Sequence, residues 1–103
     1  MKTGILNISF FWVSNRSKDY VGTKPIHGSQ CQYKNEKDEE FRRQYPSLNE
    51  GAFFSIDCIP NYELIRELCS FGKDLLVMEP KSIQDDVFHH TQQMYEDYLG
   101  IRT

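Results

Sequence analysis

Apolar and polar positions alternate most regularly in residues 4–13, and this pattern predicts a β-strand. Its even-numbered side chains are all apolar: Leu6, Ile8, Phe10 and Trp12. The odd-numbered side chains are mixed, so we expect the even-numbered face to lie on a core. Residues 51–59 alternate in the same way and predict a second central strand, in which Phe54, Ile56 and Cys58 share one face.

Residues 60–80 form a punctuated unit of helix, turn and strand, P-N-Y-E-L-I-R-E-L-C-S-F-G-K-D-L-L-V-M-E-P. Asn61 is placed to cap the helix by accepting a hydrogen bond from the first turn. Leu64, Leu68 and Phe71 recur at helical spacing and predict the buried face. Gly72 is expected to close the helix in a left-handed conformation. Residues 75–78 are all apolar and predict a strand that Pro80 ends, since proline has no backbone N–H to donate.

The segments between these units are less regular. Residues 24–34 alternate, but Pro25 and Gly28 weaken the pattern, so we predict an edge strand with His27, Ser29, Cys31 and Tyr33 on one face. A short helix capped by Ser14 or Asn15 is predicted before it. Residues 35–50 are charged and irregular, which favours a solvated connection with a helical turn around Phe41.

The last predicted element is a helix that begins near Ser82 and ends at Gly100. Ile83, Val87, Met94 and Tyr98 recur along it at helical spacing. The element order is then strand, helix, strand, strand, helix, strand, helix. This order predicts a single α+β domain over residues 1–103, ferredoxin-like βαββαβ with an additional C-terminal helix, in which the first and third strands are central.

Composition and charge narrow the class of protein. The 103 residues carry a net charge of -3, and residues 51–103 hold 4 basic against 9 acidic side chains, which argues against a broad phosphate-binding face there. Three cysteines at wide spacings are typical of reduced, buried thiols. The chain has no apolar stretch suited to a signal peptide or a membrane helix, so we expect a cytoplasmic protein that does not enter a membrane.

The residues that carry chemistry do not form a recognisable active site. His27 and Ser29 share a predicted strand face, but no acidic partner or set of metal ligands completes them. His89 and His90 are adjacent and point to different sides of a helix, and Asp86 with His90 makes at most half a metal site. Glycine-rich phosphate loops are absent. We therefore predict a protein that is not an enzyme, with no catalytic residue, metal or cofactor.

Two segments in matching order resemble a known family. Residues 60–83 are similar to the C-terminal extension of the bacterial WYL-domain transcriptional regulators, in which an amphipathic helix leads into a Ser-Phe-Gly turn and a strand ending in Glu-Pro. The segment K-P-I-H-G-S-Q at residues 24–30 resembles the Pro-Leu/Ile-His-x-Ser-Gln segment that precedes it in many members. With the terminal helix, the resemblance covers nearly the whole chain.

The resemblance implies a regulatory module that contributes to dimerisation or effector response. It implies partners such as a second copy or a neighbouring WYL domain, and a small-molecule or nucleic-acid effector. Sequence-specific DNA binding is not carried over, because this chain shows neither the winged helix nor the Trp-Tyr-Leu signature. Carried over are His27, Ser29 and Gln30 as ligand or partner contacts, and Ser70, Phe71 and Gly72 of the turn.

Two alternatives remain open at the level of sequence. The His27, Ser29 and Gln30 side chains either contact a partner or pin the sheet edge, and such polar groups more often serve the fold. The chain is alternatively a stand-alone ferredoxin-like domain that binds a small molecule between the sheet and the terminal helix. A free sheet face bearing Ile5, Phe11, Phe53 and Ile59 is then expected to seek a partner.

Overall fold

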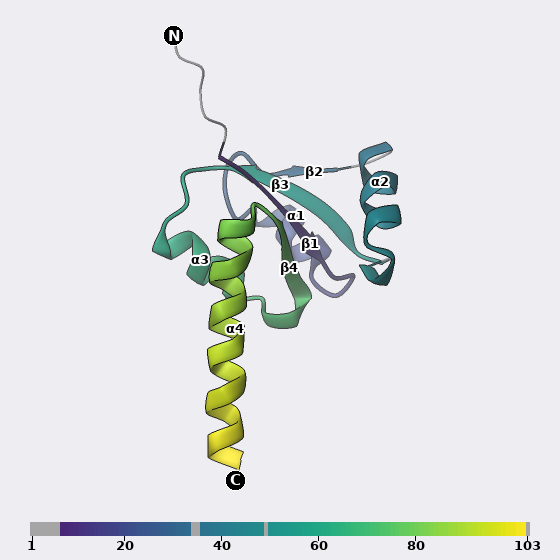
Figure 1. The fold of residues 1–103 in the computed structure, drawn as a ribbon. Helices are drawn as coiled ribbons and strands as arrows, with labels where there is room; N and C mark the ends of the chain where they lie inside the picture. The colour runs from purple at the N-terminus through teal and green to yellow at the C-terminus, as the bar shows by residue number, and fades with distance from the viewer. Residues whose placement is uncertain (1–6, 34–35, 49, 103) are drawn as a thin grey trace.

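The computed structural model describes residues 7–33, 36–48 and 50–102, apart from the side chain of residue 37, and within them the chain is an α+β protein (Figure 1). Its four strands are β1 (Ile8–Val13), β2 (Cys31–Gln32), β3 (Ala52–Asp57) and β4 (Leu75–Glu79). The helices are α1 (Lys18–Thr23), α2 (Glu36–Gln44), α3 (Tyr62–Cys69) and α4 (Lys81–Arg102), with short 3-10 turns at Pro46–Leu48 and Gly72–Asp74.

The strands form one antiparallel sheet in the order β2-β3-β1-β4. The first and third strands are central, and the second and fourth are the edges, as the sequence predicts. The two central strands pair in a register that sets Phe11 opposite Phe54 and Trp12 opposite Phe53. Since neighbouring residues of a strand point to opposite faces, this register assigns every side chain of the sheet to one of two layers.

One layer is the main core, between the sheet and helices α1, α3 and α4. Phe11 and Phe54 stack there with ring centroids 5.7 Å apart. Val21 of α1, Leu68 of α3 and Ile83 of α4 are buried against them. The predicted face of β1 is therefore wrong. Buried under the helices are Ser9, Phe11 and Val13, while Ile8, Phe10 and Trp12 lie half-buried on the other side. Leu6 lies outside the described residues.

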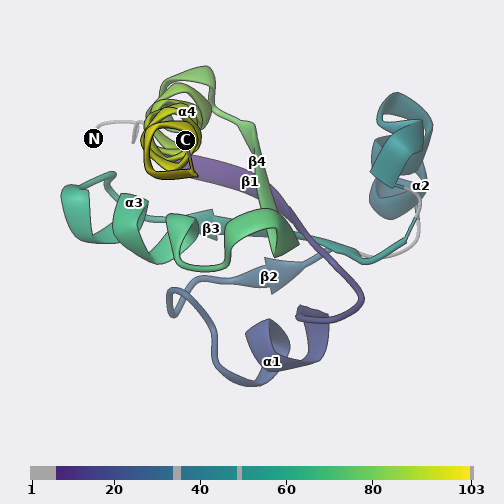
Figure 2. The ribbon, with the colours of Figure 1, turned by 90° about the horizontal axis from the view of Figure 1, so that it is seen from below.

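The second layer is aromatic and is built by α2, which is longer than the single helical turn predicted around Phe41. Residues 36–44 form a nine-residue helix where a solvated connection was expected. Phe41 packs with its ring centroid 5.0 Å from that of Phe53 and 5.7 Å from that of Tyr33. The Arg42 guanidinium lies 5.6 Å from the Phe53 ring centroid and donates to the Gly51 carbonyl at 2.7 Å. Figure 2 shows α2 standing apart from the other helices.

The predicted free apolar sheet face does not exist as such. Phe11 and Phe53 are both buried, and they lie on opposite faces because Phe53 pairs with Trp12 rather than with Phe11. Ile59 belongs to the loop after β3, where it is 73% exposed. Ile5 lies outside the described residues. The alternation of side chains within β1 and β3 was predicted correctly, but the sequence alone does not give the register between the two strands.

The predicted edge strand over residues 24–34 is also mostly wrong. Only Cys31 and Gln32 pair with β3, and residues 25–30 form a loop, in agreement with the strand-breaking effect of Pro25 and Gly28. The predicted short helix is present as α1, but it begins at Lys18 after Ser17 rather than at Ser14 or Asn15.

The unit over residues 60–80 agrees closely with its prediction. The Asn61 side chain accepts from the Leu64 N–H at 2.8 Å and caps α3. Leu68 is buried in the core, whereas Phe71 is only half-buried at its margin. Gly72 has a φ of 58°, as expected, although α3 ends at Cys69 and Gly72 opens the following 3-10 turn. Pro80 separates β4 from α4.

Helix α4 is longer than predicted and projects from the body. It begins at Lys81, with Gln84 N–H donating to the Pro80 carbonyl, and it continues through Gly100 to Arg102. Gly100 thus does not end the helix. At about 1.5 Å per residue, 22 residues span roughly 33 Å. Only the first half lies beside the sheet and α3, and the second half extends beyond them (Figure 1).

Candidate interaction groove

An apolar groove runs along the β4 edge of the sheet, between β4 and α4. Its volume is about 960 Å³. Phe88, Thr91 and Met94 of α4 form one wall, and Leu76 and Met78 of β4 form the other. The remaining lining comes from the end of α3 and the turn after it, from β4, from α4, and from one tyrosine after α2: Leu68, Cys69, Gly72, Lys73, Leu75, Val77, Gln84, Asp85, Val87, His90, Tyr95 and Tyr45.

The apolar stripe of α4 continues past the body. Ile83 is 2% exposed and Val87 packs against the core, so this stripe faces the protein at the start of the helix. Met94, Tyr98 and Ile101 continue the same stripe at helical spacing, but they are 56%, 57% and 78% exposed. An apolar stripe of a helix normally faces a core. The second half of α4 therefore presents a core-type face that the described part of the chain does not cover.

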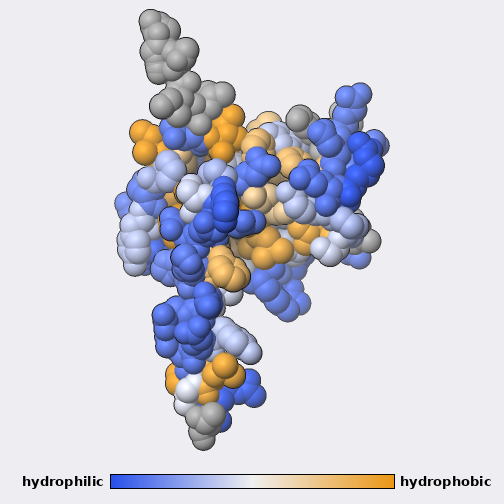
Figure 3. Space-filling model, viewed as in Figure 1, coloured by the Kyte–Doolittle hydropathy of each residue, from blue (hydrophilic) through white to orange (hydrophobic). Residues whose placement is uncertain are grey.

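Apolar side chains gather in two places near this helix. Figure 3 shows one apolar area on the body beside α4 and another near the tip of the helix. Beside the stripe, Phe88, Tyr95 and Leu99 are also at least half exposed. The polar side chains Gln92 and Glu96 occupy the opposite side of the helix at 100° per residue. The helix is thus amphipathic along its whole length.

The β4 edge is partly closed by its own helix. The Gln84 side chain of α4 donates from Nε2 to the Val77 carbonyl at 3.1 Å. Edge strands present unpaired backbone groups that otherwise attract a further strand. Gln84 satisfies one of these backbone groups. Side chains therefore form more of the groove wall than unpaired backbone groups do.

His27, Ser29 and Gln30 lie in the loop before β2, away from this groove. The Ser29 N–H donates to His27 Nδ1 at 3.1 Å, which leaves the ring proton of neutral His27 on Nε2. Ser29 Oγ also accepts from the Asp57 N–H at 2.7 Å. Gln30 accepts from the Ile26 N–H and donates to the Val21 carbonyl, each at 2.9 Å. These bonds join the loop to β3 and α1.

A smaller hollow lies beside His27. Cys58 and Glu63 line it with Ile26, and burial followed by the nearby Asp57 carboxylate raises the pKa of the Cys58 thiol. Burial also raises the pKa of the Cys69 thiol. A raised pKa keeps these thiols protonated and weakly nucleophilic near neutral pH. Cys58 and Cys69 are half-buried as free thiols, but the expectation that all three cysteines are buried fails at Cys31, which is exposed.

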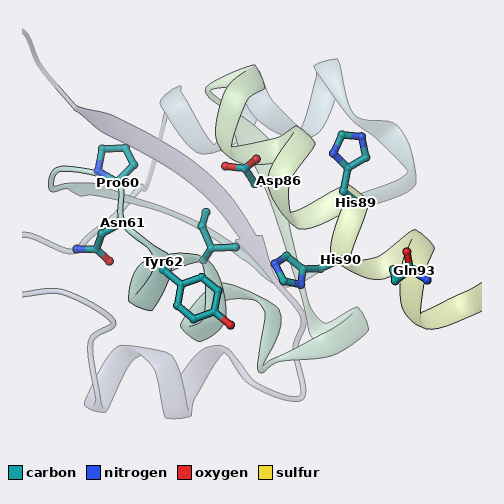
Figure 4. A pocket seen from close by; sticks show the side chains of 8 residues that line it. Pro60, Asn61, Tyr62, Asp86, His89, His90 and Gln93 are labelled. Carbon is teal, nitrogen blue, oxygen red and sulfur yellow. The ribbon is translucent and has the colours of Figure 1, made fainter. Parts of the chain in front are cut away.

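The two adjacent histidines flank a cleft between α3 and α4. Figure 4 shows His90 directed toward Tyr62, whereas His89 points away from it. Asp86 lines the same cleft one turn before His90. Among the described residues no three His, Cys, Asp or Glu side chains converge to hold a metal ion. The cleft is therefore lined by Asp86 and His90 of α4 on one side and Tyr62 of α3 on the other.

Comparison with models of known protein families, with curated proteins and with solved structures returned no match. Within the described ranges, no helix has the length and apolar character needed to cross a bilayer.

Apart from Leu68 and Gly72, which were assigned to the fold, the groove residues were not predicted as a site, although the small-molecule alternative placed a ligand between the sheet and the terminal helix. Met94 and Tyr98 were assigned to the apolar stripe of the last helix, and Phe88 and Leu99 were left unassigned. The available signal was length: the stripe repeats through Ile101, over more turns than a sheet of five- and six-residue strands can cover.

Proposed function

We propose that this chain is a non-enzymatic regulatory and oligomerisation module of the kind found as the C-terminal extension of WYL-type transcriptional regulators. The observation that carries the proposal is the uncovered apolar stripe of α4 beside an apolar groove. A contiguous exposed apolar patch on a small domain is typical of an interaction site. The resemblance over residues 24–30 and 60–83 supplies the regulatory context.

We also propose that the fold is ferredoxin-like βαββαβ, with α2 inserted between the second and third strands and α4 added after the fourth. The antiparallel strand order, with β1 and β3 in the centre, supports this assignment. Helices α1 and α3, which follow the two central strands, both contribute to the same core. In this fold α4 is an additional helix, and its exposed half is available for oligomerisation.

Light scattering after size-exclusion chromatography tests the oligomerisation role. We expect a mass above that of the monomer that increases with protein concentration. Met94→Glu and Tyr98→Glu should each return the chain to a monomer, because a carboxylate on the stripe opposes its burial. Gln93→Glu is the matched control, since Gln93 lines the cleft between α3 and α4 and not the groove. A chain that is monomeric at every concentration, or equal effects of all three changes, would refute the proposal.

A second candidate is small-molecule binding in the same groove. Its volume of about 960 Å³ lies within the usual range of ligand sites, roughly 300–1,000 Å³. A thermal-shift screen of apolar metabolites tests this role. A ligand should raise the unfolding temperature of the wild type but not that of Met78→Glu, which places a charge in the groove wall. Stabilisation of both proteins would place the ligand elsewhere.

A further inference from the structure

The groove and the exposed half of α4 are complementary in shape and chemistry. One is an apolar hollow between β4 and α4, and the other is an apolar ridge further along α4, formed by Met94, Tyr98 and Ile101. A two-fold axis between two copies would place each ridge in the other copy's groove at the same time, and such isologous contacts are the commonest form of symmetric dimer. The chain thus carries both halves of a self-complementary surface.

The exposed apolar area matches what a stable dimer needs. Phe88, Tyr95 and Tyr98 are 57–64% exposed. A fully covered aromatic side chain buries about 150–250 Å², so these three offer roughly 100–150 Å² each. Leu76, Met94, Leu99 and Ile101 are 41–78% exposed, and adding them brings the total to roughly 700–800 Å² per chain. A standard interface buries about 800 Å² on each partner.

The β4 edge favours a helix over an added strand as the occupant. A strand pairing with β4 would need the outward carbonyls, and the Val77 carbonyl already accepts from Gln84. The opposite wall is the side of α4 that bears Phe88, Thr91 and Met94. Side chains on both walls are suited to the ridge of another helix, which needs no backbone hydrogen bonds from its partner.

The charges on α4 favour one relative orientation of the two α4 helices in a dimer. Arg102 is the one basic residue of the second half of α4. Asp85, whose carboxylate also accepts from Lys81 Nζ at 3.2 Å, lines the groove beside the first half. Antiparallel helices bring Arg102 of each copy to Asp85 of the other, and the same alignment brings Leu99 opposite Phe88. Parallel helices would set Arg102 against Arg102 and Glu96 beside Glu96. Opposite charges across an interface fix its register and orientation.

From these observations we infer that the partner of the groove is a second copy of this chain, bound as an antiparallel α4 pair in which residues 94–102 of each copy fill the groove between β4 and α4 of the other. This inference rests on the proposed oligomerisation role and specifies its geometry. The pairing is isologous, with Leu99 against Phe88 and Arg102 against Asp85.

Disulfide trapping tests the geometry. Phe88→Cys and Leu99→Cys are made separately in a background in which Cys31, Cys58 and Cys69 are replaced by serine or alanine and which keeps the wild-type dimer dissociation constant. Under mild oxidation, a mixture of the two variants should form a mixed disulfide. Each variant alone should form little, because positions 88 and 99 of one helix lie about 16 Å apart along its axis.

The outcomes separate this inference from the function on which it rests. Disulfides within each single variant would indicate parallel helices and overturn the inference. If the chain dimerises but neither the mixed disulfide nor a disulfide within a single variant forms, the antiparallel geometry is overturned and the oligomerisation role is not. A strictly monomeric chain would overturn both.

A second measurement keeps the native cysteines. Arg102→Glu should weaken the dimer about two- to fivefold by facing Asp85, as expected for an exposed ion pair. Combining Arg102→Glu with Asp85→Lys should restore affinity. If the double variant binds no better than Arg102→Glu alone, the antiparallel register is wrong.

Discussion

Among the glycines that the structure describes, Gly51 has the least room for a side chain. It has a φ of 89°, and a Cβ added there would collide with the Val13 carbonyl oxygen and lie 2.8 Å from the Trp12 indole nitrogen. The Trp12 indole also donates to the Glu50 carbonyl at 2.6 Å, which holds the start of β3 against the end of β1. Glycine at this position allows the two central strands to approach.

Gly51→Ala should therefore destabilise the fold by about 3 kcal/mol or more, combining left-handed strain with a backbone collision. Gly72→Ala is the matched control: its φ is 58°, but a Cβ there meets nothing within 4 Å. It should cost only about 1–2 kcal/mol. Urea unfolding followed by tryptophan fluorescence measures both. Equal losses would show that the crowding at Gly51 is relieved by a small backbone shift.

The sequence predicted the role of a residue better where that role depends on its neighbours in the chain. The cap at Asn61 and the positive φ at Gly72 depend on a few neighbouring residues, and both were predicted. The role of Gly51 depends on contacts with Trp12 and Val13 of β1, which lie far away in the chain. A pattern along one segment does not contain such contacts.

At the scale of elements, α2 shows how a polar helix can be essential to a sheet. Its sequence is charged, yet Phe41 stacks on Phe53 and Tyr33 and covers the face opposite the main core. The helix also has acidic residues in its first turn and Arg42 and Arg43 in its last, which complements the helix dipole. That charge order was the available signal for a helix here.

Phe41→Ala should lower the free energy of unfolding by about 2–3 kcal/mol, somewhat less than for a fully buried phenylalanine, because it uncovers the aromatic layer on β1 and β3. Ile59→Ala serves as the control, since Ile59 is apolar but 73% exposed and should change stability by no more than about 0.5 kcal/mol. Urea unfolding midpoints give the comparison. An unchanged midpoint for Phe41→Ala would mean that α2 contributes nothing to the fold.

At the scale of the whole molecule, the sequence predicted the order of the strands but not which face of the sheet the helices cover. The two most regular alternating segments became the central strands. In β1 the wholly apolar face is not the one that the helices cover, so composition pointed to the wrong layer. The groove depends on where α4 leaves the body, and this follows from the packing of Ile83 and Val87 rather than from any motif.

The unsupported half of α4 links local helix stability to protein abundance. Isolated helices of this length are marginal in water, and Gly100 weakens the last turns further. Amide protons of residues 94–102 should therefore exchange quickly in dilute protein and more slowly as concentration rises, while those of α3 stay constant. Hydrogen-exchange mass spectrometry at two concentrations measures this difference. Where the protein is scarce, the same segment becomes the first place for a protease to cut, so the copy number of the chain would influence its lifetime.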